Sequence, residues 1–145
     1  MKKYYDICGL TVRADFQHKT MCERSCKYEC ECRAVDLEIP LVPESEYERL
    51  MSNPGINEDS AENIFTADYF YTALLKFGGF MLHSSAVEVD GKAYLFTAPS
   101  GTGKSTHTGL WLQLFGEKAR IINDDKPAIR IIDEVAYAYG TPWSG

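Results

Sequence analysis

The sequence lacks any long hydrophobic run and any excess of basic residues. No stretch approaches the roughly 18 consecutive apolar residues that a membrane helix needs, and the N-terminal segment has no apolar block and no small-residue cleavage site. The 145 residues carry 15 Lys and Arg against 21 Asp and Glu, a formal net charge of -6. General binding to nucleic acid or anionic membranes needs a basic surface. We therefore expect a cytoplasmic protein that binds neither, although this charge is compatible with a small local anion site.

Internal repeats and low-complexity tracts are also absent. Hydrophobic residues make up 45 % and charged residues 25 % of the chain, ordinary globular values that exclude wholesale disorder. In a reducing compartment the five cysteines are expected as thiols or metal ligands and not as disulfides. Four of them follow the spacing C-x₃-C-x₃-C-x-C: Cys22, Cys26, Cys30 and Cys32. Two interpretations of this spacing remain: a zinc or iron–sulfur site, and the simpler one of reduced thiols. Cys8 is expected in the core.

Residue patterns predict an α/β chain with a boundary near residue 56. The first part, 1–56, is expected to form a small β-rich N-terminal lobe. Its expected elements are two short strands within 4–16, a strand over 35–39 and a short helix over 44–51. The polar, cysteine-rich residues 17–34 favour no particular element.

The second part, 57–145, is predicted to form a larger domain that carries the candidate chemistry. Its expected elements are a helix over 60–77, strands over 80–89 and 92–97, a helix over 104–115, and strands over 127–132 and 135–139. Two-residue turns at Asp90-Gly91 and Asp133-Glu134 should close two hairpins. The faces expected to be buried are Ile64, Phe65, Tyr69, Leu74 and Leu75 on the first helix, and Leu110, Trp111, Leu114 and Phe115 on the second.

The segment A-P-S-G-T-G-K-S, residues 98–105, fits the phosphate-binding loop with Ala98 in place of the usual leading glycine. Gly101 and Gly103 let the backbone curl so that successive N–H groups point at an anion. Lys104 adds positive charge for the outer phosphates, and the Ser105 hydroxyl suits Mg²⁺. The next helix directs its positive N-terminal end at the same phosphates. We therefore predict bound ATP and Mg²⁺, with the nucleotide contacted by Ser100, Gly101, Thr102, Gly103, Lys104, Ser105 and Thr106.

Two adjacent carboxylates, Asp124 and Asp125, follow an apolar run about twenty residues after the loop. In enzymes with such a loop, a second acidic site after a buried strand binds the Mg²⁺ shell or takes the proton of the attacking hydroxyl. Because neighbouring residues at a strand end point differently, one carboxylate can face the metal and the other the nucleophile. An acidic turn without chemistry is the alternative.

With both motifs present, the chain resembles the HPr kinase/phosphorylase and phosphoenolpyruvate carboxykinase superfamily, particularly the small HPr-kinase-like proteins. The likeness lies in LHSSAVEVDGKAYLFTAPSGTGKSTHT (82–108), NDDKPAI (123–129) and YGTPWSG (139–145). The resemblance implies a P-loop kinase core in which a strand hairpin precedes the P-loop. It extends over residues 64–145. The resemblance is compatible with a homo-oligomer, since related kinases assemble.

The resemblance also implies roles for single residues. Lys104 contacts phosphate and takes part in catalysis, Ser105 and Asp125 bind the metal, and Asp124 is the base that activates the acceptor hydroxyl. His83 matches a histidine that such kinases place near the catalytic aspartate, although a core histidine is an equal alternative at this position. Thr106 departs from the family, which carries an acidic residue there, so HPr itself is a doubtful acceptor.

Together these features predict an ATP- and Mg²⁺-dependent kinase that phosphorylates a serine-type hydroxyl on a protein, a peptide or a small molecule. A carboxykinase-like small-molecule enzyme and a nucleotide-binding module without catalysis are the alternatives. Only 48 residues run from Ala98 to Gly145, fewer than a kinase core of this kind needs. We therefore expect a fragment with an incomplete sheet, in which Trp143 is exposed or covered by another chain.

Overall fold

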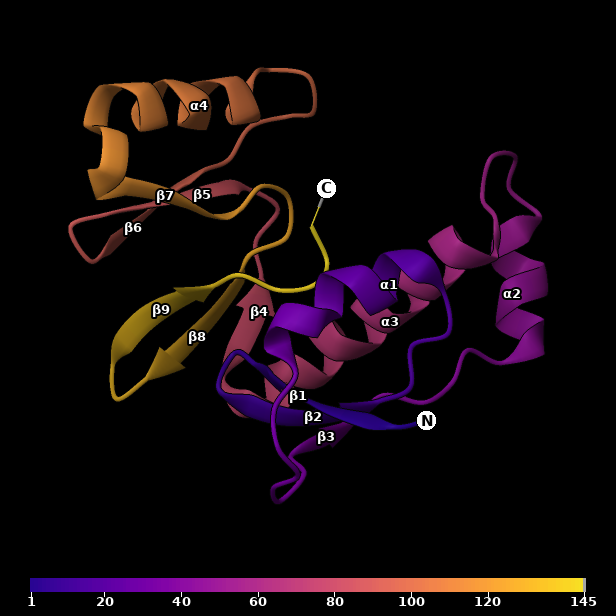
Figure 1. Ribbon diagram of the computed structural model, residues 1–145. Coiled ribbons are helices and arrows are strands. Elements are labelled where there is room, and N and C mark those ends of the chain that lie inside the picture. The colour runs from indigo at the N-terminus through magenta and orange to yellow at the C-terminus, as the bar shows by residue number, and fades with distance from the viewer. Residues whose placement is uncertain (145) are drawn as a thin grey trace. The chain divides into compact units, whose positions relative to one another are not determined.

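The computed structural model describes residues 1–144, and residue 145 lies outside the described part (Figure 1). Within residues 1–144 the chain is mixed α/β, with four α-helices and nine strands in three small sheets. None of the described helices is long and apolar enough to cross a membrane. The chain forms two compact units, Met1–Leu74 and Leu75–Gly145. The division thus follows Leu74, whereas the sequence suggested a boundary near residue 56.

The first unit begins with the predicted pair of short strands. β1 (Lys3–Ile7) and β2 (Leu10–Ala14) pair antiparallel, and Cys8 and Gly9 between them take positive φ angles of 57° and 73°. β3 (Leu37–Glu38) adds to β2 in parallel and is shorter than the strand expected over 35–39. The strand pair is confirmed, and Cys8 is buried as expected.

Helices make up more of the first unit than the predicted β-rich lobe allows. They are α1 (Lys19–Ser25), a 3-10 turn (Cys26–Tyr28), α2 (Glu44–Met51) and α3 (Glu58–Leu74). α2 confirms the helix expected over 44–51, and α3 confirms the one expected over 60–77, although it ends at Leu74. The unpredicted helical segments are therefore α1 and the 3-10 turn. α1 lies where the sequence favoured no element, because the buried Glu62 carboxylate of α3 accepts the backbone N–H groups of Gln17 and His18 at its start. α3 contacts both other helices, which is why the unit extends to Leu74.

The predicted buried face of α3 is right for Leu74, which is fully buried, and wrong for Tyr69 and Leu75, while Ile64 and Phe65 are half-buried. Leu75, just past the helix, is 65 % exposed and Tyr69 is 39 % exposed. The buried residues of α3 are Ala61, Glu62, Thr66, Ala67, Phe70, Tyr71 and Leu74. The expectation assumed that the bulkiest apolar residues define the inner face. The true face includes small and polar side chains that make internal hydrogen bonds, such as Thr66 Oγ1 to the Glu62 carbonyl at 2.7 Å.

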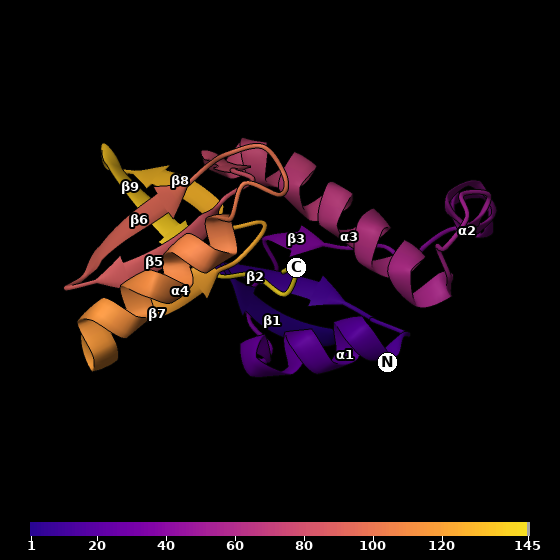
Figure 2. The same ribbon diagram turned by 90° about the horizontal axis from the view of Figure 1, so that it is seen from above.

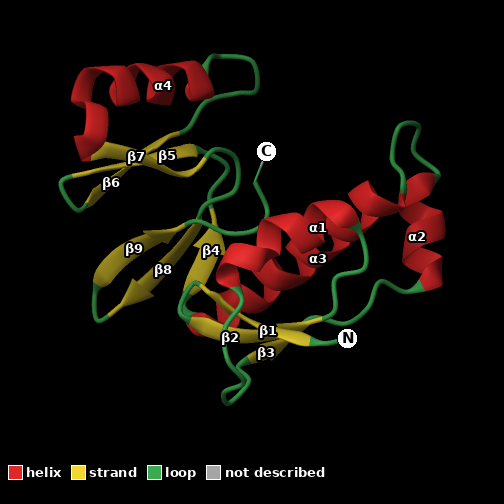
Figure 3. Ribbon diagram, viewed as in Figure 1, coloured by secondary structure: helices red, strands yellow, loops and turns green. Residues whose placement is uncertain are grey.

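The second unit opens with a short 3-10 turn (Leu75–Phe77) and contains two three-stranded sheets (Figure 3). One has the order β4-β8-β9, with β4 (Gly79–Met81), β8 (Ala128–Ile132) and β9 (Val135–Tyr139). The other has the order β6-β5-β7, with β5 (Ser85–Val89), β6 (Lys92–Phe96) and β7 (Ala119–Asn123). Residues 82–84 interrupt the single strand expected over 80–89, so β4 and β5 belong to different sheets.

Both predicted hairpins are confirmed. β5 and β6 pair antiparallel around Asp90 and Gly91, whose φ angles are 52° and 76°. β8 and β9 pair antiparallel around Asp133 and Glu134, with φ angles of 50° and 65°. Positive φ at both turn residues matches the right-handed twist of the flanking strands.

The β6-β5-β7 sheet determines where the candidate site forms. β5 runs antiparallel to both neighbours, so β6 and β7 run parallel to each other, joined by α4 (Lys104–Phe115) and a 3-10 turn (Gly116–Lys118). α4 lies over one face of this sheet, in contact with β5 and β7 (Figures 1 and 2). The ends of β6 and β7 and the start of β5 therefore lie at one edge of the sheet.

α4 has the predicted bounds, but its predicted buried face is wrong for the two leucines, while Trp111 and Phe115 are half-buried. Leu110 and Leu114 are 55 % and 78 % exposed, and the fully buried residue of the helix is Thr108. Trp111, one of the residues predicted on this face, packs its ring against Tyr94 and Phe96 of β6. The prediction for Trp143 is also wrong, because its side chain is fully buried in this chain and its carbonyl accepts the Thr141 hydroxyl.

Candidate functional site

The loop between β6 and α4 is curled. Gly101 and Gly103 take φ angles of 82° and 93°, in the left-handed region that favours glycine. Both the backbone N–H and the hydroxyl of Thr102 donate to the Pro99 carbonyl, at 3.3 and 2.6 Å. Lys104 Nζ reaches back over the loop and donates to the Ala98 carbonyl at 2.8 Å. The ammonium is thus held at the loop, where it can serve an anion bound there.

Asp124 follows β7 and faces the first turn of α4. Ser105 Oγ lies 3.0 Å from both carboxylate oxygens of Asp124. Ser85 Oγ, from the start of β5, donates to Asp124 Oδ1 at 2.7 Å. A hydroxyl and a carboxylate are oxygen ligands of the kind that Mg²⁺ prefers. Ser105 and Asp124 therefore fit a magnesium ion by the chemistry of their donor atoms.

Asp125 faces a different set of groups. His83 Nε2 lies 2.8 Å from Asp125 Oδ1, and Lys126 Nζ lies 3.1 Å from Asp125 Oδ2. The His83 side chain is 51 % exposed, so this histidine does not belong to the core. The resemblance implied that His83 lies near Asp124 and that Asp125 lies nearer the metal. The contacts have the reverse pairing: Asp125 pairs with His83, and Asp124 with Ser105.

Asn123 shapes the turn that separates the two carboxylates. Its side chain is buried, and its Oδ1 accepts the backbone N–H groups of Asp125 and Lys126, each at 2.9 Å. The Ser84 N–H donates to the Asp125 carbonyl at 3.2 Å, which fixes the same turn from the β5 side. These bonds direct Asp124 toward α4 and Asp125 toward His83.

Two buried hydroxyls that the sequence analysis missed lie behind Asp124. Ser85 and Thr108 are both 0 % exposed, and their Oγ atoms are 3.0 Å apart. Serine and threonine are common in strands and helices, so neither carries a signal in sequence. Among the other predicted contact residues, Ser100 and Thr106 are exposed at the surface of the loop and helix.

The cysteine-rich segment carries most of its thiols on the surface. Cys22, Cys26 and Cys32 are exposed and Cys30 is half-buried. Within residues 1–144, no group of three or more His, Cys, Asp or Glu side chains is arranged to hold a metal ion. The interpretation as reduced thiols is thus the one that the geometry favours for this segment.

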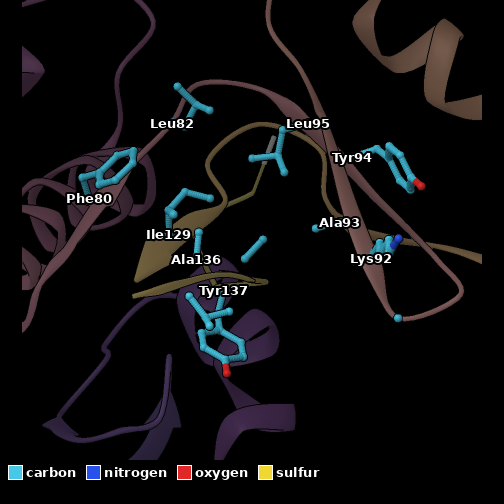
Figure 4. Close-up of a pocket in the computed structure, with 12 residues that line it drawn as sticks. Phe80, Leu82, Lys92, Ala93, Tyr94, Leu95, Ile129, Ala136 and Tyr137 are labelled. Atoms are coloured by element: carbon cyan, nitrogen blue, oxygen red, sulfur yellow. The ribbon is translucent and has the colours of Figure 1, made fainter. Parts of the chain in front are cut away.

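A groove of about 650 Å³ lies elsewhere in the second unit, between β6 and β9 (Figure 4). Its walls are mainly apolar and include Leu95 and Tyr94 on one side and Ala136 and Tyr137 on the other. The predicted nucleotide, metal and catalytic residues are not among those that line it.

The chain matches no family model, no curated protein and no solved structure in the comparisons made.

Proposed function

We propose that this chain is an ATP- and Mg²⁺-dependent phosphotransferase of the HPr kinase and phosphoenolpyruvate carboxykinase type, acting on a serine-type hydroxyl. The observation that supports this proposal most is the contact of Ser105 with both carboxylate oxygens of Asp124, beside a loop curled at Gly101 and Gly103. A turn-forming Gly-Ser-Thr segment without function would not need a carboxylate opposite its serine. When bound, Mg²⁺·ATP supplies the phosphoryl group and the charge neutralisation.

The direction of the Ser105 hydrogen bond supports a role in cation binding. A carboxylate can only accept, so the Ser105 hydroxyl must direct its single hydrogen toward Asp124. The lone pairs of its oxygen are then left for a cation. We assign Ser105 and Asp124 to the cation, and Lys104 with the N–H groups of residues 100–106 to the phosphates.

Asp125 is better suited than Asp124 to take the proton of the acceptor hydroxyl. Asp124 faces Ser105, which we assign to the cation, whereas Asp125 lies on the other side of the turn, beside Lys126 and the exposed His83. His83 Nε2 holds Asp125 Oδ1 in place, so that the carboxylate keeps one orientation while an acceptor approaches. This assignment exchanges the roles that the resemblance implied.

Phosphoryl transfer from labelled ATP tests the proposal. The purified chain is incubated with Mg²⁺ and with serine peptides, seryl proteins or small alcohols, while ADP binding is followed by calorimetry. Asp125→Asn should lose transfer and keep Mg²⁺-dependent ADP binding, whereas Asp124→Asn should lose the Mg²⁺ dependence itself. Asp133→Asn, in the exposed β8–β9 turn, is the matched control. Binding without turnover for every acceptor would favour a nucleotide-binding module, and absence of binding would refute the proposal.

A further inference from the structure

We infer that Ser85 is a positioning residue that holds Asp124 for the cation; this inference rests on the proposed function. Ser85 is the first residue of β5, the central strand of its sheet. Its side chain is fully buried, and its Oγ donates to Asp124 Oδ1 at 2.7 Å. Asp124 therefore contacts two hydroxyls, one buried behind it and one, Ser105, on the exposed side.

The single hydrogen of the Ser85 hydroxyl fixes the direction of its two contacts. Ser85 gives its hydrogen to Asp124, so its oxygen can only accept in its contact with Thr108 Oγ1, 3.0 Å away. The single hydrogen of Thr108 can go to Ser85 Oγ or to the Ser105 carbonyl. Thr108 Oγ1 also lies 3.0 Å from the Ser105 carbonyl. The buried pair thus connects the first turns of α4, which carry Ser105, with the carboxylate that Ser105 contacts.

A neutral donor suits this position better than a charged one. The Ser85 hydroxyl orients Asp124 without compensating its negative charge, which then remains for a cation. Asp125 has the opposite environment, because the Lys126 ammonium lies 3.1 Å from its Oδ2. Loss of the Ser85 hydroxyl would leave Ser105 as the hydroxyl contact of Asp124 and would free the carboxylate to rotate away from the loop.

The neighbouring serine offers a matched control. Ser84 is also 0 % exposed, and its hydroxyl donates to the Leu82 carbonyl at 3.1 Å. Ser84→Ala and Ser85→Ala therefore remove the same buried atom from adjacent positions. A purely structural role for the hydroxyl predicts similar consequences for both variants.

The test compares the dissociation constant of ADP with and without Mg²⁺, measured by calorimetry on the whole chain. For Ser85→Ala we expect Mg²⁺ to tighten ADP binding about tenfold less than in the wild type, the equivalent of one charge-assisted hydrogen bond. Binding of ADP without Mg²⁺ should stay unchanged, and Ser84→Ala should behave as the wild type. Thr108→Val keeps the side-chain shape and removes the hydroxyl that contacts Ser85 Oγ. This variant tests the same connection if Ser85→Ala does not fold.

The outcomes separate the inference from the proposed function. If Ser85→Ala and Thr108→Val keep the full effect of Mg²⁺, or if Ser84→Ala loses it equally, the inference is wrong and the proposed function stands. If wild-type protein shows no Mg²⁺-dependent ADP binding, both are wrong.

Discussion

Ser105 Oγ lies 3.0 Å from both carboxylate oxygens of Asp124, although 19 positions separate the two residues in the chain. The backbone of the β6-β5-β7 sheet brings them together. In β5, Ala86 lies opposite Leu95 of β6 on one side and Asn123 of β7 on the other. The segments that follow Leu95 and Asn123 therefore leave the sheet at the same edge, and the contact is a consequence of strand register.

Lys104→Ala is expected to weaken ATP binding about 10- to 100-fold, because hydrogen bonds to charged groups contribute about 1.5–3 kcal/mol each. Its ammonium is held at the loop by the Ala98 carbonyl, and that bond is replaceable by water at the surface. Calorimetry with ATP and Mg²⁺ measures the effect. Lys118→Ala, an exposed lysine after α4, should bind ATP as the wild type does. Equal ATP affinities for the two variants would show that Lys104 does not contribute to binding the phosphates.

Gly103→Ala should weaken ADP binding and lower the stability of the chain by about 1–2 kcal/mol. Its φ of 93° is costly for any residue with a Cβ, whereas an added Cβ would meet its nearest neighbour, Thr106 Cβ, only at 3.9 Å. The cost is therefore conformational and not steric, and it is relieved by uncurling the loop. Urea unfolding and ADP calorimetry measure the two effects.

Gly109→Ala is the control for that substitution. Gly109 lies within α4, and a Cβ there would meet nothing within 4 Å. Alanine in a helix interior is about 0.5–1 kcal/mol better than glycine, so this variant should be more stable than the wild type and bind ADP equally well. Destabilisation of both variants to the same extent would contradict the role assigned to the loop conformation.

Part of the fold could be predicted from local residue preferences, and part depends on contacts between residues far apart in the sequence. The turns at Asp90-Gly91 and Asp133-Glu134, the loop glycines and the bounds of α4 were predictable, because each depends on conformational preferences of the residues concerned. α1 was not, because a carboxylate more than 40 positions away satisfies its first N–H groups. The predicted inner faces of α3 and α4 were only partly right, with Leu110 and Leu114 exposed, because the surrounding elements determine which side chains are buried.

The candidate site, too, could be predicted only in part from the sequence. Motif spacing identified the loop and the two aspartates, but it could not tell which carboxylate faces Ser105 and which faces His83. That choice depends on the turn that Asn123 fixes through its two backbone bonds. The roles of Ser85 and Thr108 could not be predicted from the sequence, because they depend on contacts that only the folded structure shows.

Glu62→Ala should destabilise the chain by about 2–4 kcal/mol, since two backbone N–H groups at the start of α1 would lose their acceptor. The Glu62 oxygens lie 2.7 and 2.9 Å from the N atoms of Gln17 and His18. Glu62→Gln keeps one of its two acceptor oxygens and should cost less than the alanine variant. Urea unfolding ranks the three proteins. A loss for the glutamine variant as large as that for alanine would show that packing or charge, and not the acceptors, decides the effect.

Thr20→Val should destabilise the chain at neutral pH, and this effect should fade in acid. Hydrogen bonds from the hydroxyl and the backbone N–H of Thr20 hold the pKa of Asp59 below its usual value of 3.8. A carboxylate with a lowered pKa stabilises the fold above its unfolded pKa and loses that contribution as the pH falls through its folded pKa. The stability gap between wild type and Thr20→Val should thus be constant from about pH 7 to 5 and narrow below about pH 4. Urea unfolding across this range measures the gap, with Thr72→Val, at an exposed position of α3, as the control. A gap that keeps its size in acid would mean that Thr20 acts through packing and not through the charge of Asp59.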